Sequence, residues 1–275
     1  MLAPFLLFFT VFVLYPVVMN VYYSFTDYNL SPNPKWVGFK NYARLPKDKN
    51  FVAALKNTAV YALCSVVTLT ALGFLTAAAL NRQMRGVKWI RMLMIFPYAT
   101  SLTAVGMIWL MMYDPTSGFL NKLLRFLHLP VKSWLFDPGT ALGCLIFVNV
   151  WKNIGYCMLI YLAGMQSIPE DIYEAATVEG AGEWRKLIHI TMPMVRPVAF
   201  FVLVTTTVES FKTFELVAVT TGGGPLNATS TLVHQIYQRG FTEYKMGYAS
   251  AVSVVLLAVV FLVTMLNYRM NRAAE

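Results

Sequence analysis

Six long apolar runs constrain the fold of this chain more than any other feature. They cover Leu2–Tyr23, Thr58–Leu80, Met92–Tyr113, Thr140–Ala163, Val198–Val219 and Ala249–Tyr268. A helix that rises 1.5 Å per residue needs roughly 20 residues to cross a hydrocarbon layer about 30 Å thick. The strands of a membrane β-barrel would instead alternate in polarity over roughly 10 residues. Charged residues are only 13% of the chain, against about 25% in soluble domains. The sequence predicts an all-α integral membrane protein with six transmembrane helices.

The distribution of charge indicates an orientation and argues against a nucleic-acid partner. The formal net charge is +9, but the basic residues flank the apolar runs and form no basic stretch interleaved with aromatic residues. Arg82, Arg85, Lys88 and Arg91 crowd one very short loop. The outer loops contain slightly more lysine and arginine in total, which is contrary to the positive-inside rule, whereas dense basic charge in a short loop favours the cytoplasm. We therefore expect N-in and C-in topology.

The cysteine and histidine residues indicate no metal or redox site. Cys64, Cys144 and Cys157 lie within apolar runs and lack Cys-x-x-Cys spacing, so we interpret them as small buried hydrophobic side chains. The histidines fall in separate loops. We expect this chain itself to bind no metal and no cofactor.

The chain is expected to form one membrane domain with two parts. Residues 1–57 contain the first helix and a long outer loop, and residues 58–275 contain a core of five helices with a cytoplasmic loop at residues 164–196. A further outer segment, Asp114–Pro138, carries apolar residues at helical spacing, which predicts a short amphipathic helix at the membrane interface. These residues are Phe119, Leu120, Leu123, Leu124 and Leu127.

The cytoplasmic loop predicts two short helices outside the membrane. Ser167 and Glu170 have the spacing of a capping box that opens the first helix. Gly180 suits the position after its end, where a positive φ is needed. The second helix presents one apolar face, formed by Trp184, Leu187, Ile188 and Thr191. We expect Pro193 and Pro197 to end this helix before the fifth apolar run.

Small side chains in the first of these helices suit the close approach of another protein. Ala175 and Ala176 leave the backbone accessible, and Glu174 is able to pair with a basic residue of a partner. An ordinary helical hairpin, in which the alanines serve only as good helix formers, explains the same residues. The spacing alone leaves both interpretations open.

The same loop resembles the signature of permeases from binding-protein-dependent ABC importers, E-A-A-x3-G-x9-I-x-L-P. The matching residues are Glu174, Ala175, Ala176, Gly180, Ile190 and Pro193. Met192 replaces the leucine and keeps its volume and apolar character. Further segments, including Thr221-Gly222-Gly223-Gly224-Pro225 and Leu162–Pro169, look like the carbohydrate branch of that family, the maltose and glycerol 3-phosphate type with a MetI-like transmembrane domain.

The resemblance implies the type I ABC importer permease fold, with the loop acting as a coupling helix that inserts into an ATPase subunit. It implies four further partners: a second homologous permease, two ATP-binding cassette subunits and a periplasmic or extracellular solute-binding protein. ATP and Mg²⁺ would be bound by the ATPase subunits. The chain would lie among the lipids of a bacterial cytoplasmic (inner) membrane and import a sugar or related polyol. Glycerol 3-phosphate or a phosphodiester is the alternative solute.

Polar residues inside the apolar runs are candidates for the substrate pathway. Asn149, Asn153 and Tyr156 form a stripe on the fourth run, which either joins helices or faces the pathway. Glu209 and Lys212 share one face of the fifth run. They either form an intrahelical ion pair that stabilises the bundle or line a translocation cavity, and both roles are compatible.

The sequence also separates this chain from other functional classes. It contains no G-x-x-x-x-G-K-[ST] phosphate-binding motif, so we expect ATP hydrolysis on other subunits. The H-E-x-x-H and G-x-S-x-G motifs of hydrolases are also missing, and we expect no enzymatic activity. A secondary transporter is the rival class, but it predicts an inverted repeat that we do not find.

Overall fold

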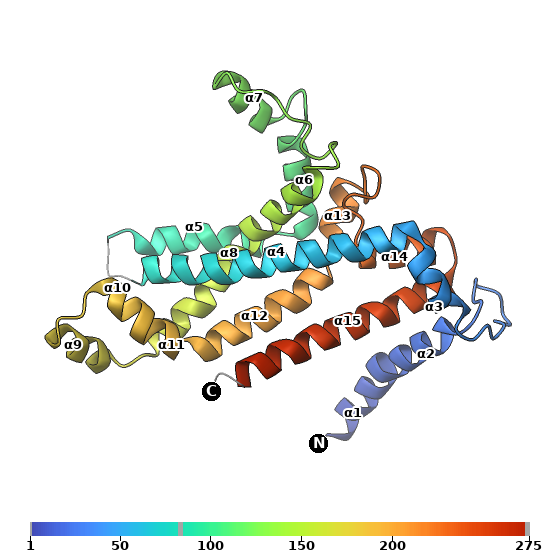
Figure 1. Cartoon of the computed structure of the whole chain (residues 1–275), viewed down its shortest axis with the longest axis horizontal. Coiled ribbons are helices and arrows are strands. Elements are labelled where there is room, and N and C mark those ends of the chain that lie inside the picture. Colours follow the sequence, from blue (N-terminus) through green and yellow to red (C-terminus); the bar gives the residue numbers. More distant parts are fainter. Residues whose placement is uncertain (1, 82–84, 273–275) are drawn as a thin grey trace.

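The computed structural model describes residues 2–81 and 85–272. In these ranges the regular elements are helices joined by loops, with one isolated β-bridge between Thr26 and Trp36. Four helical stretches are long and apolar enough to cross a membrane (Figure 1). They are Ala3–Ser24, α4 (Lys49–Leu80), α8 (Ala141–Gln166) and Met246–Met270 in α15 (Met246–Arg272). Two bent pairs raise the number of possible crossings to six. Among the four basic residues that indicated the orientation, Arg82 lies outside the described residues.

The first stretch is a nearly continuous helix that stands apart from the core. It consists of α1 (Ala3–Phe9), a π-helical turn η1 (Thr10–Leu14) and α2 (Tyr15–Ser24). None of its most apolar window is buried, and α2 packs mainly on α15 (Figure 1). The first stretch is therefore joined to the rest of the chain mainly through α15.

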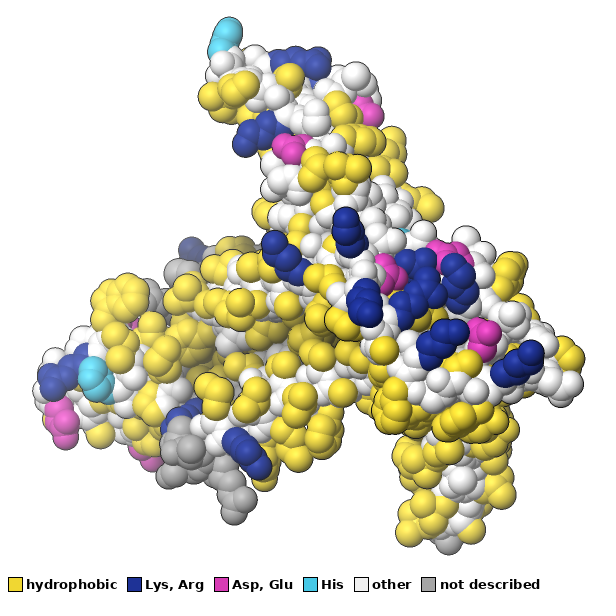
Figure 2. Space-filling model, turned by 45° about the vertical axis from the view of Figure 1, so that its right-hand side comes forward, with side chains coloured by type: hydrophobic (Ala, Val, Ile, Leu, Met, Phe, Trp, Pro, Cys, Tyr) yellow, Lys and Arg dark blue, Asp and Glu magenta, His cyan; other side chains and the backbone are white. Residues whose placement is uncertain are grey.

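The core is built around the contact between α4 and α8. A Cβ atom at Gly73 of α4 would lie 2.7 Å from the Cβ of Cys157 on α8, so glycine allows the two helices to approach closely. Tyr161 and Met158 of α8 are buried in the same cluster. The helix α12 (Arg196–Phe211) packs on both α4 and α15. Much of the outer surface of these helices is hydrophobic (Figure 2), as expected for contact with lipid.

The second predicted helix is longer than its apolar run. It begins at Lys49 because the carboxylate of Asp48 caps it, accepting a hydrogen bond from the Asn50 amide at 2.9 Å. The boundary that we predicted between residues 57 and 58 therefore falls inside α4. The expectation that all three cysteines are buried is wrong for Cys64, which is exposed on this helix, whereas Cys144 and Cys157 are buried.

The third apolar run is broken in two. It forms α5 (Val87–Ala99) and α6 (Leu102–Met112), which meet at an angle of 99°. Thr100 and Ser101 adopt extended backbone conformations between them. The hydroxyl of Thr100 donates to the carbonyl of Pro97 at 2.6 Å. Hydroxyl side chains commonly supply such hydrogen bonds to backbone groups that lose their helical partners near a proline. The bend is thus a full interruption of the helix.

The fifth apolar run is also interrupted, so the continuous helix expected over Val198–Val219 is wrong. Helix α12 ends at Phe211, and a separate short helix, α13 (Glu215–Thr220), follows. The hydroxyl of Thr231 donates to the carbonyl of Thr213 at 3.0 Å between the two helices. Leu216 is buried in a second core cluster, beside Trp109 of α6. Tertiary packing of α13 outweighs the apolar periodicity of the run.

The outer segments fold into short helices at the end of the bundle away from residues 167–194. The predicted amphipathic helix is α7 (Phe119–Phe126), which projects from the bundle beyond α6 (Figure 1). Its buried Asn121 donates to the carbonyls of Pro115 and Lys132 and accepts from the indole of Trp134. Helices α3 (Lys40–Arg44) and α14 (Leu232–Tyr237), with the π-helical turn η4 (Gln238–Thr242), lie near the start of α4.

Candidate functional site

Residues 167–194 form the predicted helical hairpin, at one end of the bundle (Figure 1). Its first helix is α9 (Glu170–Val178), and its second arm is α10 (Glu183–Lys186), a π-helical turn η3 (Leu187–Thr191) and α11 (Met192–Met194). Gly180 ends α9 with φ +78°. Its amide donates to the carbonyl of Thr177, and the amide of Ala181 donates to that of Ala176. These two bonds make a Schellman motif, which confirms that Gly180 occupies the position after the end of the helix.

The residues of the recognised motif are not all on one surface of the hairpin. Glu174, Ala175 and Gly180 are exposed on the first helix and the turn, and so is Pro193 on the second arm. Ala176 is buried, and Ile190 is half-buried. The exposed members leave a small, open surface around the turn, where no heavy atom would lie within 4 Å of a Cβ at Gly180.

Two side-chain contacts that sequence reasoning missed hold the two arms together. The hydroxyls of Tyr173 and Thr191 lie 2.9 Å apart. The ammonium of Lys186 donates to the hydroxyl of Thr177 at 2.8 Å. Tyr173 also packs against the core cluster that includes Met165, near the end of α8. The hairpin is therefore a braced unit attached to α8. The tyrosine directly before the motif was the one sequence feature that indicated this.

Three details of the predicted hairpin are wrong. Ser167 does not cap α9, because it still has a helical backbone at the end of α8 and its hydroxyl donates to the carbonyl of Gly164 at 2.8 Å. Pro169 is the N-cap residue instead. The second arm passes through Pro193 and ends at Met194, after the π-turn widens the helix before the proline. Of its predicted packing face, Thr191 is buried but Trp184 is 75% exposed.

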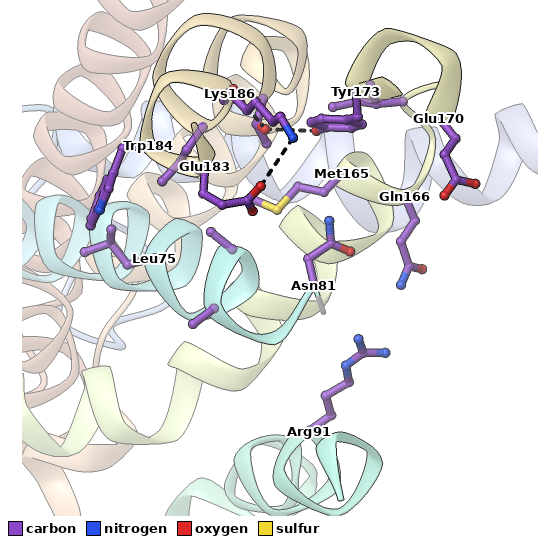
Figure 3. Close-up of a pocket in the computed structure, with 15 residues that line it drawn as sticks. Leu75, Asn81, Arg91, Met165, Gln166, Glu170, Tyr173, Glu183, Trp184 and Lys186 are labelled. Carbon is purple, nitrogen blue, oxygen red and sulfur yellow. Dashed lines mark hydrogen bonds and ion pairs between the residues drawn. The ribbon is translucent and has the colours of Figure 1, made fainter. Parts of the chain in front are cut away.

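An open pocket of about 810 Å³ separates the hairpin from the adjoining ends of α4, α5 and α8. Lys186 and Tyr173 lie at one end of this pocket and Arg91 at the other (Figure 3). Lys186 forms an ion pair with Glu183 at 3.3 Å. The pocket leaves one side of the hairpin open. On the other side, α9 of the hairpin packs against the end of α8.

The candidate pathway residues meet around a second cavity, of about 880 Å³, within the membrane-spanning part. Its lining includes all five residues singled out in the sequence: Asn149, Asn153, Tyr156, Glu209 and Lys212. The α8 stripe thus faces the end of α12 across open space. The structure brings these residues together, although their apolar runs are separated in the chain by the entire hairpin.

The contacts of these residues show whether each pair bonds within a helix, lines the cavity, or does both. The Asn153 amide donates to the backbone carbonyl and the side-chain oxygen of Asn149, both at 2.9 Å, so this pair is bonded within α8. Glu209 and Lys212 lie 3.6 Å apart, and their side chains are 76% and 63% exposed. An exposed pair of this kind contributes little to stability. The pair forms, and it also lines the cavity.

Two further features of the cavity were not predicted. Tyr98, at the end of α5, stacks on Tyr156 with ring centroids 4.6 Å apart and an interplanar angle of 13°. Lys152, which the sequence showed only as a neighbour of the stripe, is 93% buried and reaches the break between α5 and α6. Among the described residues, no group of three or more histidine, cysteine or acidic side chains is placed to hold a metal ion.

Known proteins resemble this chain over nearly its whole length. The family described as binding-protein-dependent transport system inner membrane component matches residues 69–275. The chain is 34% identical to a probable ABC transporter permease protein, YurN, of Bacillus subtilis, covering 97% of this chain and 93% of the relative. It is also 34% identical to the sn-glycerol-3-phosphate transport system permease protein UgpA of Brucella suis, covering 98% and 92%. The diacetylchitobiose uptake system permease protein NgcF of Streptomyces coelicolor is 34% identical, covering 96% and 79%.

Solved structures show the same fold. A chain of the bacterial alginate ABC transporter, crystallised with an alginate pentasaccharide-bound periplasmic protein, superposes with a TM-score of 0.90. The match covers 100% of this chain and 93% of that one at 22% identity. The MetNI methionine ABC transporter in an inward-facing conformation gives a TM-score of 0.58 over 84% of this chain at 16% identity. At these identities the likeness concerns the fold alone.

Proposed function

The chain belongs to the family of binding-protein-dependent transport system inner membrane components, and from that membership we propose that it is the permease subunit of an ATP-driven importer for a sugar or related polyol. The observation that carries the proposal is the braced hairpin at residues 167–194. It projects from the membrane-spanning bundle, continues directly from α8 and leaves the glycine turn of the motif open. A transporter that worked alone would have no use for such a docking surface.

We propose that Glu174, Ala175, Ala176, Gly180, Ile190 and Pro193 form the coupling segment that contacts an ATPase subunit. Glu174, Ala175 and Gly180 would touch the partner, because they are exposed. Ala176 and Ile190 would instead hold the hairpin in shape, because they face inward. The full assembly would contain a second permease, two ATPase subunits that bind ATP and Mg²⁺, and an external solute-binding protein. This chain would hydrolyse no ATP itself.

The proposed solute class rests on the relatives and on the chemistry of the cavity. The related permeases are named for diacetylchitobiose and for sn-glycerol 3-phosphate. Amides of Asn149 and Asn153 are able to exchange hydrogen bonds with hydroxyl groups, and the stacked Tyr98 and Tyr156 offer an aromatic wall. A neutral sugar or polyol suits this lining, and glycerol 3-phosphate is the alternative.

We propose N-in and C-in topology for the chain in the inner membrane. In Figure 1 α12 leads away from the hairpin and α15 returns beside it, so the end of α15 lies on the same side as the hairpin. If the hairpin meets an ATPase in the cytoplasm, the C-terminal end of α15 is cytoplasmic as well. Arg91 lines the pocket beside the hairpin, and Arg85 and Lys88 are close to it at the start of α5, so the dense positive charge that favours the cytoplasm is on this side as well.

Gly180→Asp tests the coupling role. The turn has open space but a positive φ, so the substitution costs about 1 kcal/mol of backbone strain and adds a charge at the docking surface. We expect the variant to reach the membrane at the normal level and to lose at least about tenfold in ATP-dependent uptake, a factor within the range typical of coupling between sites. Gly38→Asp is the matched control, because Gly38 also has a positive φ, +58°, and open space.

Uptake is measured in vesicles, with the solute that the purified binding protein carries, and the assembly is checked by mild-detergent purification. Co-purification of an ATPase and a second permease with wild-type chain supports the importer. Normal uptake by Gly180→Asp, or an equal loss in Gly38→Asp, contradicts the coupling role. Wild-type uptake that persists without ATP and without other subunits would overturn the proposal and favour a secondary transporter.

A further inference from the structure

The break between α5 and α6 leaves backbone carbonyls without the partners that a continuous helix would supply. Such groups need other donors inside a membrane, where water is scarce. The carbonyl of Pro97 accepts from the amide and the hydroxyl of Thr100, and Lys152 of α8 supplies a further donor to it and a donor to two other carbonyls. Its ammonium lies 3.0 Å from the carbonyl oxygen of Pro97, 3.0 Å from that of Tyr98 and 2.7 Å from that of Thr100. All three hydrogens of the ammonium are thereby used on one break.

A second contact fixes the same two elements one helical turn further along α8. A Cβ atom at Gly155 would clash with the carbonyl oxygen of Met94 and would lie 3.0 Å from the Cα of Ile95. Gly155 follows Lys152 by three residues and so lies on the same helix face. The backbone of α8 therefore touches the last turns of α5 directly, while Lys152 holds the point where α5 ends.

The helix that carries Lys152 also carries the hairpin. α8 is a single helix of 26 residues from Ala141 to Gln166, and α9 begins at Glu170. At 1.5 Å per residue, about 21 Å of helix connects Lys152 to Gln166. Tyr173 of α9 packs with Met165 of α8 in one cluster, so the hairpin is attached to the end of this rod.

The break is also part of the cavity wall. Tyr98 lines the cavity and stacks on Tyr156 of α8, and the Lys152 ammonium lies 5.7 Å from the centre of the Tyr98 ring. Lys152 therefore touches both the lining of the cavity and the rod that ends at the hairpin. Glu209 and Lys212, which also line this cavity, are already paired with each other.

We propose that Lys152 is a positioning residue that locks the α5–α6 break to α8, so that the cavity wall, α8 and the hairpin move as one body during transport. This inference rests on the proposed function, because only an importer driven through the hairpin has a movement to transmit. A lysine that merely satisfied buried carbonyls would support folding but would not link ATP hydrolysis to events at the outer face.

Hydrolysis of ATP by the whole importer in nanodiscs gives the first test. The assembled importer is assayed first without the binding protein and then with the solute-loaded binding protein as purified from cells. Four forms are compared: wild type, Lys152→Met, Lys152→Arg and Lys88→Met. Lys88 is exposed on α5 and provides the matched control. We expect Lys152→Met to keep its basal hydrolysis but to lose stimulation by the binding protein by at least about fivefold, the lower end of coupling between sites. Lys152→Arg keeps the charge and should restore part of the stimulation.

A parallel loss of basal and stimulated hydrolysis in Lys152→Met would show a structural role only and overturn the inference, as would unchanged stimulation. The wild-type importer distinguishes the two proposals. If its hydrolysis does not respond to the binding protein, the proposed function fails; if it responds and the Lys152 variants respond equally, only the inference fails.

A distance measurement keeps the inference testable if Lys152→Met does not assemble. Spin labels are placed at Leu93 of α5 and Met107 of α6, both exposed, in a chain in which Cys64 is replaced by alanine. With Lys152 intact, the distance between the labels should be the same without nucleotide and with ATP in the absence of Mg²⁺. A change of more than about 5 Å, the size of a one-turn displacement, would show that the break flexes during transport and would overturn the inference.

Discussion

Arg239→Met probes an ion cluster at the end of the bundle opposite the hairpin. One guanidinium nitrogen of Arg239 donates to both carboxylate oxygens of Glu243 at 2.8 Å, and the other donates to Asp48 at 3.0 Å. The hydroxyl of Tyr248 donates to the same Asp48 oxygen at 2.8 Å. Because Asp48 caps α4 and Tyr248 lies in α15, one arginine joins the starts of two membrane helices. Basic and acidic side chains gather together on this part of the surface (Figure 2).

The expected loss of stability follows from what remains after the change. The side chains of Arg239 and Asp48 are each 12% exposed, and removal of one partner from a fully buried pair costs about 3–5 kcal/mol. Asp48 keeps its hydrogen bonds from Tyr248 and the Asn50 amide, so we expect about 2–3 kcal/mol. Methionine retains the packing of the apolar stem. In a chain of this size, that loss lowers the melting temperature by about 5–10 °C.

Thermal unfolding in detergent, followed by intrinsic fluorescence, measures this shift. Lys245→Met is the matched control, because Lys245 pairs with Glu243 at 2.7 Å but is 48% exposed and should contribute less than about 1 kcal/mol. Combining Asp48→Asn with Arg239→Met should recover part of the loss, since residue 48 then carries no buried charge that lacks its arginine, and Glu243 keeps its ion pair with Lys245. Equal shifts for Arg239→Met and Lys245→Met, or a double variant less stable than Arg239→Met, would refute the reasoning.

Two further predictions concern pH and packing. Burial raises the pKa of Asp48 and of Glu243, but hydrogen bonds and the charge of Arg239 outweigh it, so each pKa lies below its ordinary value. Such carboxylates stabilise the fold above their unfolded-state pKa, so the melting temperature should decrease when the pH is lowered below about 4. The decrease should be less steep in Asp48→Asn, and an equally steep decrease in that variant would contradict this prediction. Gly155→Ala should destabilise the chain by at least about 2 kcal/mol through overpacking. Gly143→Ala, whose added methyl group would meet nothing within 4 Å, should be neutral in the same thermal assay. Equal effects of the two substitutions would count against the close contact between α8 and α5.

The sequence predicted the membrane helices well because hydrocarbon imposes a simple requirement. Each of the six apolar runs contains a helix or a bent pair of helices, since every backbone group in lipid needs an internal partner. The turn of the hairpin was also predictable, because glycine tolerates the positive φ of Gly180 at low cost. Local chemistry determined both features.

The errors arose where a neighbouring helix or a tertiary contact overrules the pattern within one segment. Ser167 and Glu170 have capping-box spacing, but the end of α8 extends as far as Ser167 and uses its hydroxyl. The fifth apolar run reads as one helix, yet burial of Leu216 beside α6 ends α12 early. α6 is distant in sequence from the fifth run, and α8 directly precedes Ser167 but belongs to another apolar run. A pattern confined to one segment therefore carries no information on these outcomes.

Lys152 shows why charge inside a membrane helix is hard to interpret from sequence. A lysine costs roughly 2.5–3.5 kcal/mol at the centre of a membrane helix, so its presence indicates a partner but does not identify one. Ionic partners were available in the sequence, namely Glu209 and Glu215, and both line the same cavity. The structure pairs Glu209 with Lys212 and directs Lys152 to backbone carbonyls. Those acceptors exist only because α5 and α6 separate, so the break and the lysine depend on each other, and each had to be located before the other could be interpreted.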